Sequence, residues 1–215
     1  LADYEPPKTV LAPVVQRSGE APSGKVALET NFRSEYDSLH IILNGEIFAR
    51  WYDYQDIDTK IHFLDYIVSE KEDVTGHYVV YKDGRSYRSG DFEVTSYPLN
   101  DYDYKYIDDF EEDKGNFGMG DFKIEMPQNF QSGALNSRHP YRNDREETAL
   151  LLTPVIVADE NAFFEYEDIA IVEPGEEGSK FGDQEFWDYV IVEATKNGIE
   201  WKPLEDGYDS NYDED

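Results

Sequence analysis

The sequence of 215 residues contains no cysteine, so neither a disulfide framework nor a thiolate metal site is available to it. Basic residues are also scarce, because 19 Lys and Arg stand against 48 Asp and Glu, for a formal net charge of −29. A field of that sign repels the phosphates of nucleic acids and anionic membrane surfaces, which excludes both as partners. Calcium, cationic protein patches and neutral sugars stay compatible with such a surface.

Long apolar runs are missing as well. No run approaches the roughly 20 apolar residues of a membrane-spanning helix, so we expect no direct membrane insertion. The chain starts at Leu1 with no charged-then-apolar leader, which predicts a mature, processed chain or an excised segment. A secreted location is permitted by all of these absences.

The residues that are present favour β-structure. Hydrophobic residues make up 39% of the chain, enough for a core, and the 15% aromatics include 17 tyrosines, which favour sheet. Two strand-like runs flank each of three turn signals, at Asn44-Gly45, Asp83-Gly84 and Asn197-Gly198. Such pairs suit the type I′ turn of a β-hairpin, which needs positive φ at both positions. No segment has the length and caps of a helix, so the sequence predicts an all-β protein.

Spacing and charge predict how the chain is divided. Further short strand-like runs at residues 9–15, 25–32 and 59–68 have the spacing of a β-sandwich. Residues 1–98 carry a net charge of −7 (10 basic, 17 acidic) and residues 99–215 one of −22 (9 basic, 31 acidic), which predicts a boundary near residue 99. The predicted parts are a linker (1–7), a first sandwich (8–98), a second domain (99–210) and an acidic tail (211–215).

Four motifs in the second half carry a resemblance to a known family. They are Val172-Glu-Pro-Gly175, Phe186-Trp-Asp-Tyr-Val190, Trp201-Lys-Pro-Leu204 and Asp206-Gly-Tyr-Asp209. Residues 110–210 resemble the jelly-roll modules, related in appearance to MAM-type domains, of bacterial surface proteins and proteases exported by the type IX secretion system. The first half resembles the immunoglobulin- or fibronectin-like sandwiches that precede such modules.

The resemblance implies two β-sandwich domains, the second incomplete, in a non-catalytic protein at the extracellular or outer-membrane surface of a bacterium. It implies binding or adhesion to a protein or glycan there, and calcium as a stabilising ion. Residues 3–10 also resemble the tether of surface lipoproteins, without their acylated cysteine. Two alternatives stay open: a cargo or component of a type IX secretion or gliding-motility assembly, and an accessory module of a secreted glycoside hydrolase or protease.

Clustered carboxylates indicate where calcium would bind, because hard oxygen ligands suit Ca²⁺ and a cation offsets their mutual repulsion. The clusters lie at residues 108–113, 165–168 and 209–213. The last lacks the glycine of an EF-hand loop, with Glu214 in its place, and we interpret it as an acidic tail. The candidate ligands, taken as strand-end ligands of a jelly roll, are Asp109, Glu111, Glu167, Asp168 and Asp188.

No catalytic residue is predicted, and we expect no enzyme activity. Aligned on Trp201, a sialidase-type Asp-box keeps only Gly198, so we interpret this segment as a hairpin with a packing tryptophan. A pair of glycosidase carboxylates cannot be recognised without distances, and no Gly-x-Ser-x-Gly elbow occurs. The four histidines are too widely spaced to predict zinc.

Aromatic side chains supply the candidate ligand-binding residues. Trp51, Tyr52 and Tyr54 could form a sugar platform, and so could Trp187 with Trp201. The alternative for each is packing in the core or across strands.

Overall fold

The computed structural model describes residues 9–137, 140, 146–158 and 160–211, and within those ranges the chain forms strands and loops without a helix. The prediction of an all-β protein is therefore confirmed. The predicted linker, and residues 212–215 of the predicted acidic tail, lie outside the described residues. No helix in the described part is long and apolar enough to cross a membrane.

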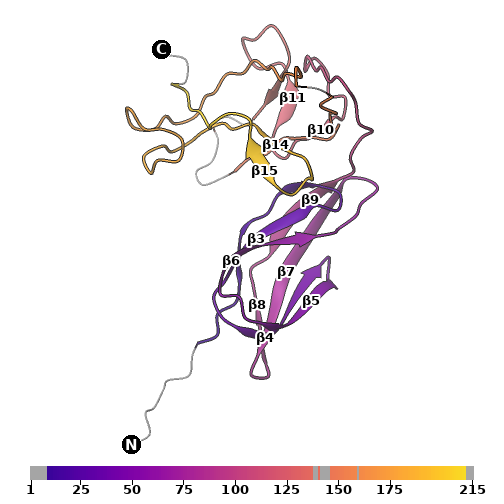
Figure 1. The fold of residues 1–215 in the computed structure, drawn as a ribbon, viewed down its shortest axis with the longest axis vertical. Helices are drawn as coiled ribbons and strands as arrows, with labels where there is room; N and C mark the ends of the chain where they lie inside the picture. The colour runs from indigo at the N-terminus through magenta and orange to yellow at the C-terminus, as the bar shows by residue number, and fades with distance from the viewer. Residues whose placement is uncertain (1–8, 138–139, 141–145, 159, 212–215) are drawn as a thin grey trace, which may run out of the picture. The chain divides into compact units, whose positions relative to one another are not determined.

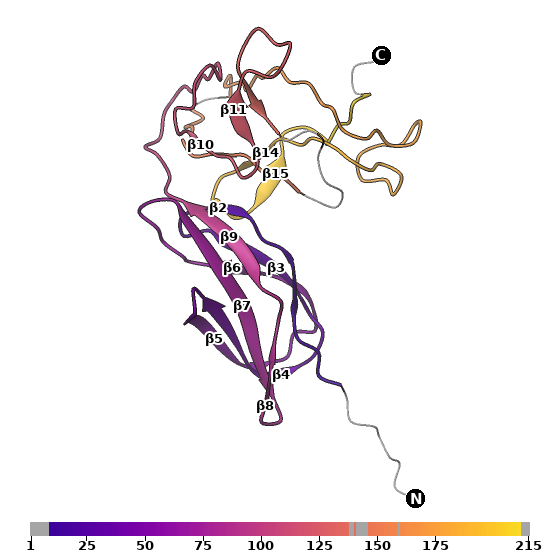
Figure 2. The ribbon, with the colours of Figure 1, turned by 180° about the vertical axis from the view of Figure 1, so that it is seen from behind.

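The first part of the chain forms two mainly antiparallel layers, which Figures 1 and 2 show in indigo to magenta. The smaller sheet has the order β1-β3-β6, and the larger has the order β2-β9-β7-β4-β5, with β8 paired to β7. Only the β2–β9 pair is parallel among these neighbours. The bounds are β1 Val14–Arg17, β2 Glu20–Pro22, β3 Val26–Phe32, β4 Tyr36–Leu43, β5 Glu46–Tyr54, β6 Asp58–Leu64, β7 Glu72–Lys82, β8 Arg85–Arg88 and β9 Phe92–Tyr97.

One hydrophobic core lies between these two layers. Alternate residues of β3 are buried, with Leu28 and Phe32 fully so, and they pack with the inward residues of the larger sheet. Leu39 on β4 and both Tyr78 and Val80 on β7 are also fully buried. Since a strand points successive side chains to opposite faces, the core residues fix which residues of β4, β5 and β7 face outward. This architecture is a β-sandwich.

Two of the three predicted hairpins have the predicted turn. Asn44 (φ 48°) and Gly45 (φ 84°) join β4 to β5, and Asp83 (φ 49°) and Gly84 (φ 71°) join β7 to β8. The third hairpin pairs β14 (Glu193–Thr195) with β15 (Trp201–Pro203) across a longer loop, so its predicted two-residue turn is wrong. In that loop the Thr195 and Asn197 side chains accept backbone N–H groups, which stabilises the longer connection.

The rest of the chain is poorer in strands. Two short pairs follow the sandwich, β10 (Phe117–Gly118) with β13 (Leu150–Leu151) and β11 (Lys123–Glu125) with β12 (Ala134–Asn136). The chain divides into two compact units, Leu1–Ile156 and Val157–Asp215. The sandwich strands end at Tyr97, and residues 98–156 belong to the first unit. The predicted boundary at residues 98 and 99 stays a prediction.

A polar network runs through the sandwich core at His62 of β6. Its Nε2 lies 3.2 Å from the hydroxyl of Tyr54, and its Nδ1 lies 3.2 Å from the hydroxyl of Tyr78. Thr30 donates to the Tyr78 hydroxyl at 3.1 Å. A Tyr78 hydroxyl that accepts from Thr30 can give its own proton to Nδ1, and in that neutral tautomer Nε2–H donates to Tyr54. Burial lowers the pKa of His62, against the opposing effect of Asp56.

We expect the sandwich to lose stability on mild acidification. The pKa of His62 in the folded chain lies below its ordinary value of 6.5, so the unfolded chain takes up the proton first. The contribution of neutral His62 to the free energy of unfolding is intact above about pH 6.5 and falls as the pH drops below that value. Thermal unfolding followed at pH 7.5 and 5.5 measures it, and His62→Phe should reduce the difference in melting temperature. Equal pH dependence in the two proteins would contradict the role given to His62.

Candidate functional site

The outer face of the larger sheet carries two tyrosines on either side of a serine. Ser38 on β4 stands opposite Tyr52 of β5 on one side and opposite Tyr81 of β7 on the other. Their neighbours Leu39 and Val80 are fully buried in the core, so these three side chains point away from it. We call the surface formed by Ser38, Tyr52, Tyr81 and the adjoining His40 and Arg50 the tyrosine face.

The two rings of the tyrosine face are available to a ligand. Tyr52 is 70% exposed and Tyr81 is 38% exposed, whereas Ser38 between them is only 9% exposed. The backbones of Tyr52 and Tyr81 are separated by two strand spacings, or about 9–10 Å. Among the described residues the rings of Tyr52 and Tyr81 make no contact with each other, so each ring is free to pack on a ligand.

Two further side chains line the adjacent row of the same face. His40 of β4 stands opposite Arg50 of β5, and its ring lies 5.1 Å from the ring of Tyr81 at an angle of 53°. This contact supports the orientation of Tyr81. Burial and the charge of Arg50 lower the pKa of His40, so its imidazole is neutral at pH 7. Arg50 supplies planar N–H donors at the edge of the face.

This arrangement of side chains is better suited to binding a sugar than to catalysing a reaction. A pyranose ring has an apolar face that packs on an aromatic ring, and hydroxyls that accept hydrogen bonds from a donor such as Arg50. The separation of the two tyrosine backbones is close to the length of a disaccharide unit, so alternate rings of one chain can reach both. An anionic polysaccharide would be repelled by the net charge of −29, which favours a neutral one.

The structure brings together only part of the predicted aromatic platform. Trp51 stacks on His62 with centroids 4.9 Å apart, and Tyr54 contacts the same ring at 5.9 Å, so both lie on the core side. Burial raises the pKa of Tyr54 to about 12. Of the three predicted residues, Tyr52 is the one whose side chain faces solvent, at 70% exposure. Its companion Tyr81 was not predicted, although its position next to the apolar Val80 in a predicted strand is a signal that places the two side chains on opposite faces.

The alternative pair, Trp187 and Trp201, lies in the second unit. Trp187 is 49% exposed and Trp201, on β15, is 40% exposed. The structure shows no contact between their rings among the described residues, so nothing identifies them as a joint platform.

The first predicted calcium cluster already contains a cation. Lys114 Nζ lies 3.2 Å from Asp108 Oδ1 and 3.1 Å from Asp109 Oδ1. The side chain of Asp108 is only 2% exposed and also accepts the hydroxyl of Tyr106. Glu111, the other predicted ligand, accepts the backbone N–H of Gly133 at 3.2 Å. The ammonium group therefore does here what a calcium ion would do, because it offsets the repulsion between neighbouring carboxylates.

We expect Lys114→Met to make the chain more sensitive to acid. Burial acts to raise the pKa of Asp108, but hydrogen bonds from Tyr106, the Phe110 N–H and Lys114 outweigh it and hold the pKa below 3.8. This stabilisation is present above pH 3.8 and is lost as the pH falls through the lowered value. Without Lys114 that pKa rises, so acid unfolding moves to a higher pH.

The measurement is an acid titration of the folded chain followed by tyrosine fluorescence. Lys105→Met, at an exposed position of the same segment, is the matched control and should titrate like the unchanged chain. Superimposable curves for Lys114→Met and the control would contradict the structural role of Lys114.

The other predicted calcium ligands are in the second unit. Asp168 accepts the hydroxyl of Tyr208 at 2.7 Å, Glu167 is exposed, and Asp188 is half-buried. Across the described residues, no three His, Asp or Glu side chains converge in a way that could hold a metal ion. Calcium therefore stays a prediction that depends on the resemblance.

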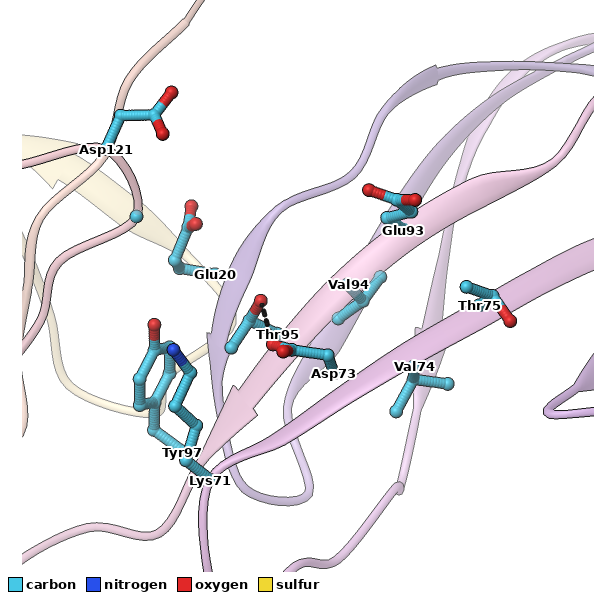
Figure 3. Close-up of a pocket in the computed structure, with 11 residues that line it drawn as sticks. Glu20, Lys71, Asp73, Val74, Thr75, Glu93, Val94, Thr95, Tyr97 and Asp121 are labelled. Carbon is cyan, nitrogen blue, oxygen red and sulfur yellow. Dashed lines mark hydrogen bonds between the residues drawn. The ribbon is translucent and has the colours of Figure 1, made fainter.

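A groove at the other end of the large sheet is a second candidate surface. It has a volume of about 410 Å³ and is lined by residues of β7 and β9, by Glu20, and by Gly120 and Asp121. Figure 3 shows Lys71 running alongside Tyr97, with its Nζ 5.5 Å from the ring centroid. The Thr95 hydroxyl donates to Asp73 at 2.9 Å. The Lys71 ammonium group and the Thr95 hydroxyl thus already contact other residues of the groove, and we assign no ligand to it.

Comparison with known proteins identifies no function for this chain. No family model matches the sequence, and no curated protein does. Among solved structures the chain is similar to CopC from Methylosinus trichosporium OB3b, with 17% sequence identity and a TM-score of 0.27. That alignment covers 39% of this chain and 86% of the other. At this TM-score the likeness carries no argument, so the functional conclusion depends on the site itself.

Proposed function

We propose that this chain is a non-catalytic binding module of a secreted or cell-surface bacterial protein, and that it binds a neutral glycan on the tyrosine face. The observation that carries the proposal is the pair Tyr52 and Tyr81, which are exposed on the larger sheet on either side of Ser38. Exposed aromatic rings on a rigid sheet give a ligand a contact surface at low cost in side-chain entropy. The secreted location comes from the family resemblance in the second half of the sequence.

The composition of the face favours binding over hydrolysis. Glycoside hydrolysis uses two carboxyl groups placed on either side of the scissile bond. The residues of the tyrosine face are a serine, a neutral histidine, an arginine and two tyrosines, which hold a sugar but offer no acid and base pair. An accessory role beside a separate catalytic domain is consistent with the same surface.

Affinity electrophoresis tests the proposal directly. Residues 1–215 would be run through native gels that contain a soluble cellulose derivative, laminarin, xylan or starch. We expect retardation by at least one of these neutral polysaccharides, and loss of retardation in Tyr52→Ala. Tyr102→Ala removes an equally exposed tyrosine (63%) outside the face and should leave the retardation unchanged. Free migration through every gel would reject the glycan as ligand.

Calcium is a separate part of the proposal and has its own test. A ligand that binds only the folded chain stabilises it by about 2.7 kcal/mol when its free concentration is a hundredfold above the dissociation constant. Calorimetric melting in calcium should therefore show a higher transition temperature than melting in EDTA. Identical transitions would reject calcium as a ligand and would not affect the glycan proposal.

A further inference from the structure

Residues 162–172 of the second unit have the sequence of a β-strand but no strand partner. The run Ala-Phe-Phe-Glu-Tyr-Glu-Asp-Ile-Ala-Ile-Val is rich in aromatic and β-branched residues, which favour sheet. Within the described residues, however, none of this run is assigned to a strand, and no backbone hydrogen bond joins it to another segment. Its N–H and C=O groups are therefore available for pairing, as on the edge of a sheet.

The side chains of this run are exposed to an unusual degree. Phe163 is 86% exposed, Phe164 is 62% exposed, and Ile169 and Ile171 are 66% and 60% exposed. Single exposed apolar residues are common, but several of them together in one short segment mark a contact surface. The run thus combines unpaired backbone with uncovered apolar side chains.

One face of the run is nevertheless fixed. The hydroxyl of Tyr208 donates to Asp168 Oδ2 at 2.7 Å and lies 3.1 Å from the hydroxyl of Tyr166. Tyr166 also contacts Phe164, with ring centroids 5.3 Å apart. Next to Tyr208, the buried Asp209 accepts the backbone N–H of Gly175. These contacts use alternate residues of the run, and in a paired strand Phe163, Ile169 and Ile171 would lie on the other face.

Charge indicates what kind of strand can pair with it. The second unit, residues 157–215, carries 3 basic and 19 acidic side chains, for a net charge of −16. In an extended strand, Glu165 and Glu167 would lie on the same face as Phe163, Ile169 and Ile171. In an antiparallel pair of two copies centred on Glu167, this glutamate would face itself, and like charges directly opposite each other are destabilising. A second copy of this chain is therefore a poor partner, and a basic strand is a good one.

We infer that residues 162–172 bind a partner polypeptide by β-strand addition, and that the partner strand alternates basic with apolar residues. The main-chain hydrogen bonds give affinity in this mode of recognition, and the side chains give specificity. Basic side chains of the partner pair with Glu165 and Glu167, and apolar ones pack on Phe163, Ile169 and Ile171. This surface is independent of the tyrosine face, and it gives the module a protein partner besides its glycan.

Two peptides of identical charge test the inference. One is a short peptide that alternates lysine and valine, and the other carries N-methyl groups on alternate amides, which prevents strand pairing. Hydrogen exchange of the full chain with each peptide is read by mass spectrometry. We expect the unmodified peptide to protect residues 162–172 and to bind about tenfold more tightly, which corresponds to about 1.4 kcal/mol. Equal protection by both peptides, or none in this segment, would overturn the inference.

A charge-reversed variant separates this mode from general attraction to an acidic protein. The double variant Glu165→Lys and Glu167→Lys should prefer a peptide that alternates glutamate and valine. The matched control, Glu176→Lys and Glu177→Lys, reverses two exposed charges elsewhere in the unit and should keep the original preference. Protection of residues 162–172 that appears with protein concentration and without peptide would identify a second copy as the partner and would also overturn the inference.

Discussion

Replacing Tyr52 and Tyr81 together by alanine is expected to weaken glycan binding by about 100-fold or more, with each single change costing about 10- to 30-fold. Aromatic residues at the centre of a binding surface commonly contribute about 2 kcal/mol each, and 1.4 kcal/mol corresponds to a factor of ten. Both rings are exposed and face solvent beside Ser38, so truncation removes contact area without opening the core. Isothermal titration with the glycan retained in the electrophoretic screen measures the effect.

The melting temperature of these variants is the control that separates lost binding from lost folding. Substitutions at exposed positions usually change the free energy of unfolding by no more than about 0.5 kcal/mol. The melting temperature of the double variant should therefore match that of the unchanged chain. A double variant that binds as tightly as the unchanged chain would place the glycan elsewhere on the molecule.

A large loss of stability is also expected from a substitution in the hydrophobic core of the sandwich. Phe32→Ala is expected to lower the free energy of unfolding of the sandwich by about 3–5 kcal/mol, the usual cost of deleting a buried phenylalanine ring. Phe32 is fully buried, and its ring lies 4.8 Å from Tyr54, 5.0 Å from His62 and 5.7 Å from Tyr78. Its loss therefore removes packing on both sheets and on the hydrogen-bonded network between them.

Urea unfolding of Phe32→Ala and of Phe63→Ala measures this difference. Phe63 lies on β6 of the same sheet as Phe32 but is 46% exposed, so its truncation should cost much less. Similar losses in the two variants would mean that the core does not lie between the two sheets as described.

Local chemistry made two hairpins predictable from the sequence. Asn44-Gly45 and Asp83-Gly84 adopt positive φ at both turn positions, as residues of these types do at low cost. The Asn197-Gly198 hairpin differs because backbone N–H groups donate to the side chains of Thr195 and Asn197, which stabilises a longer loop. Hairpins depend on a few adjacent residues, and so their prediction needs no knowledge of the rest of the fold.

The tyrosine face was only partly predictable, because it depends on register between distant strands. Asp53 has a positive φ of 50°, and it lies between Trp51 and Tyr54, which both contact His62 instead of alternating. No sequence pattern marked this change of facing. Tyr81 joins Tyr52 only because β4 lies between β5 and β7, a pairing order that the sequence does not state.

Residues 99–215, the more acidic part of the chain, differ most from the structure that the sequence predicts. Its strand-like runs were predicted to form strands, but only short pairs such as β14 with β15 occur among its described residues. Alternation predicts that a segment can pair, whereas pairing itself requires a neighbouring strand of suitable charge. In residues 162–172 the first condition is met and the second is not, which is why we infer an external partner there.

The most direct test of the glycan proposal is a nuclear magnetic resonance titration of the isotopically labelled chain with an oligosaccharide of the retained glycan. The proposal predicts that the largest shift changes fall on the amides of Ser38, His40, Tyr52 and Tyr81, and that the residues of the groove around Asp73 stay unchanged. Shift changes centred on that groove, or on no residue of the larger sheet, would contradict it.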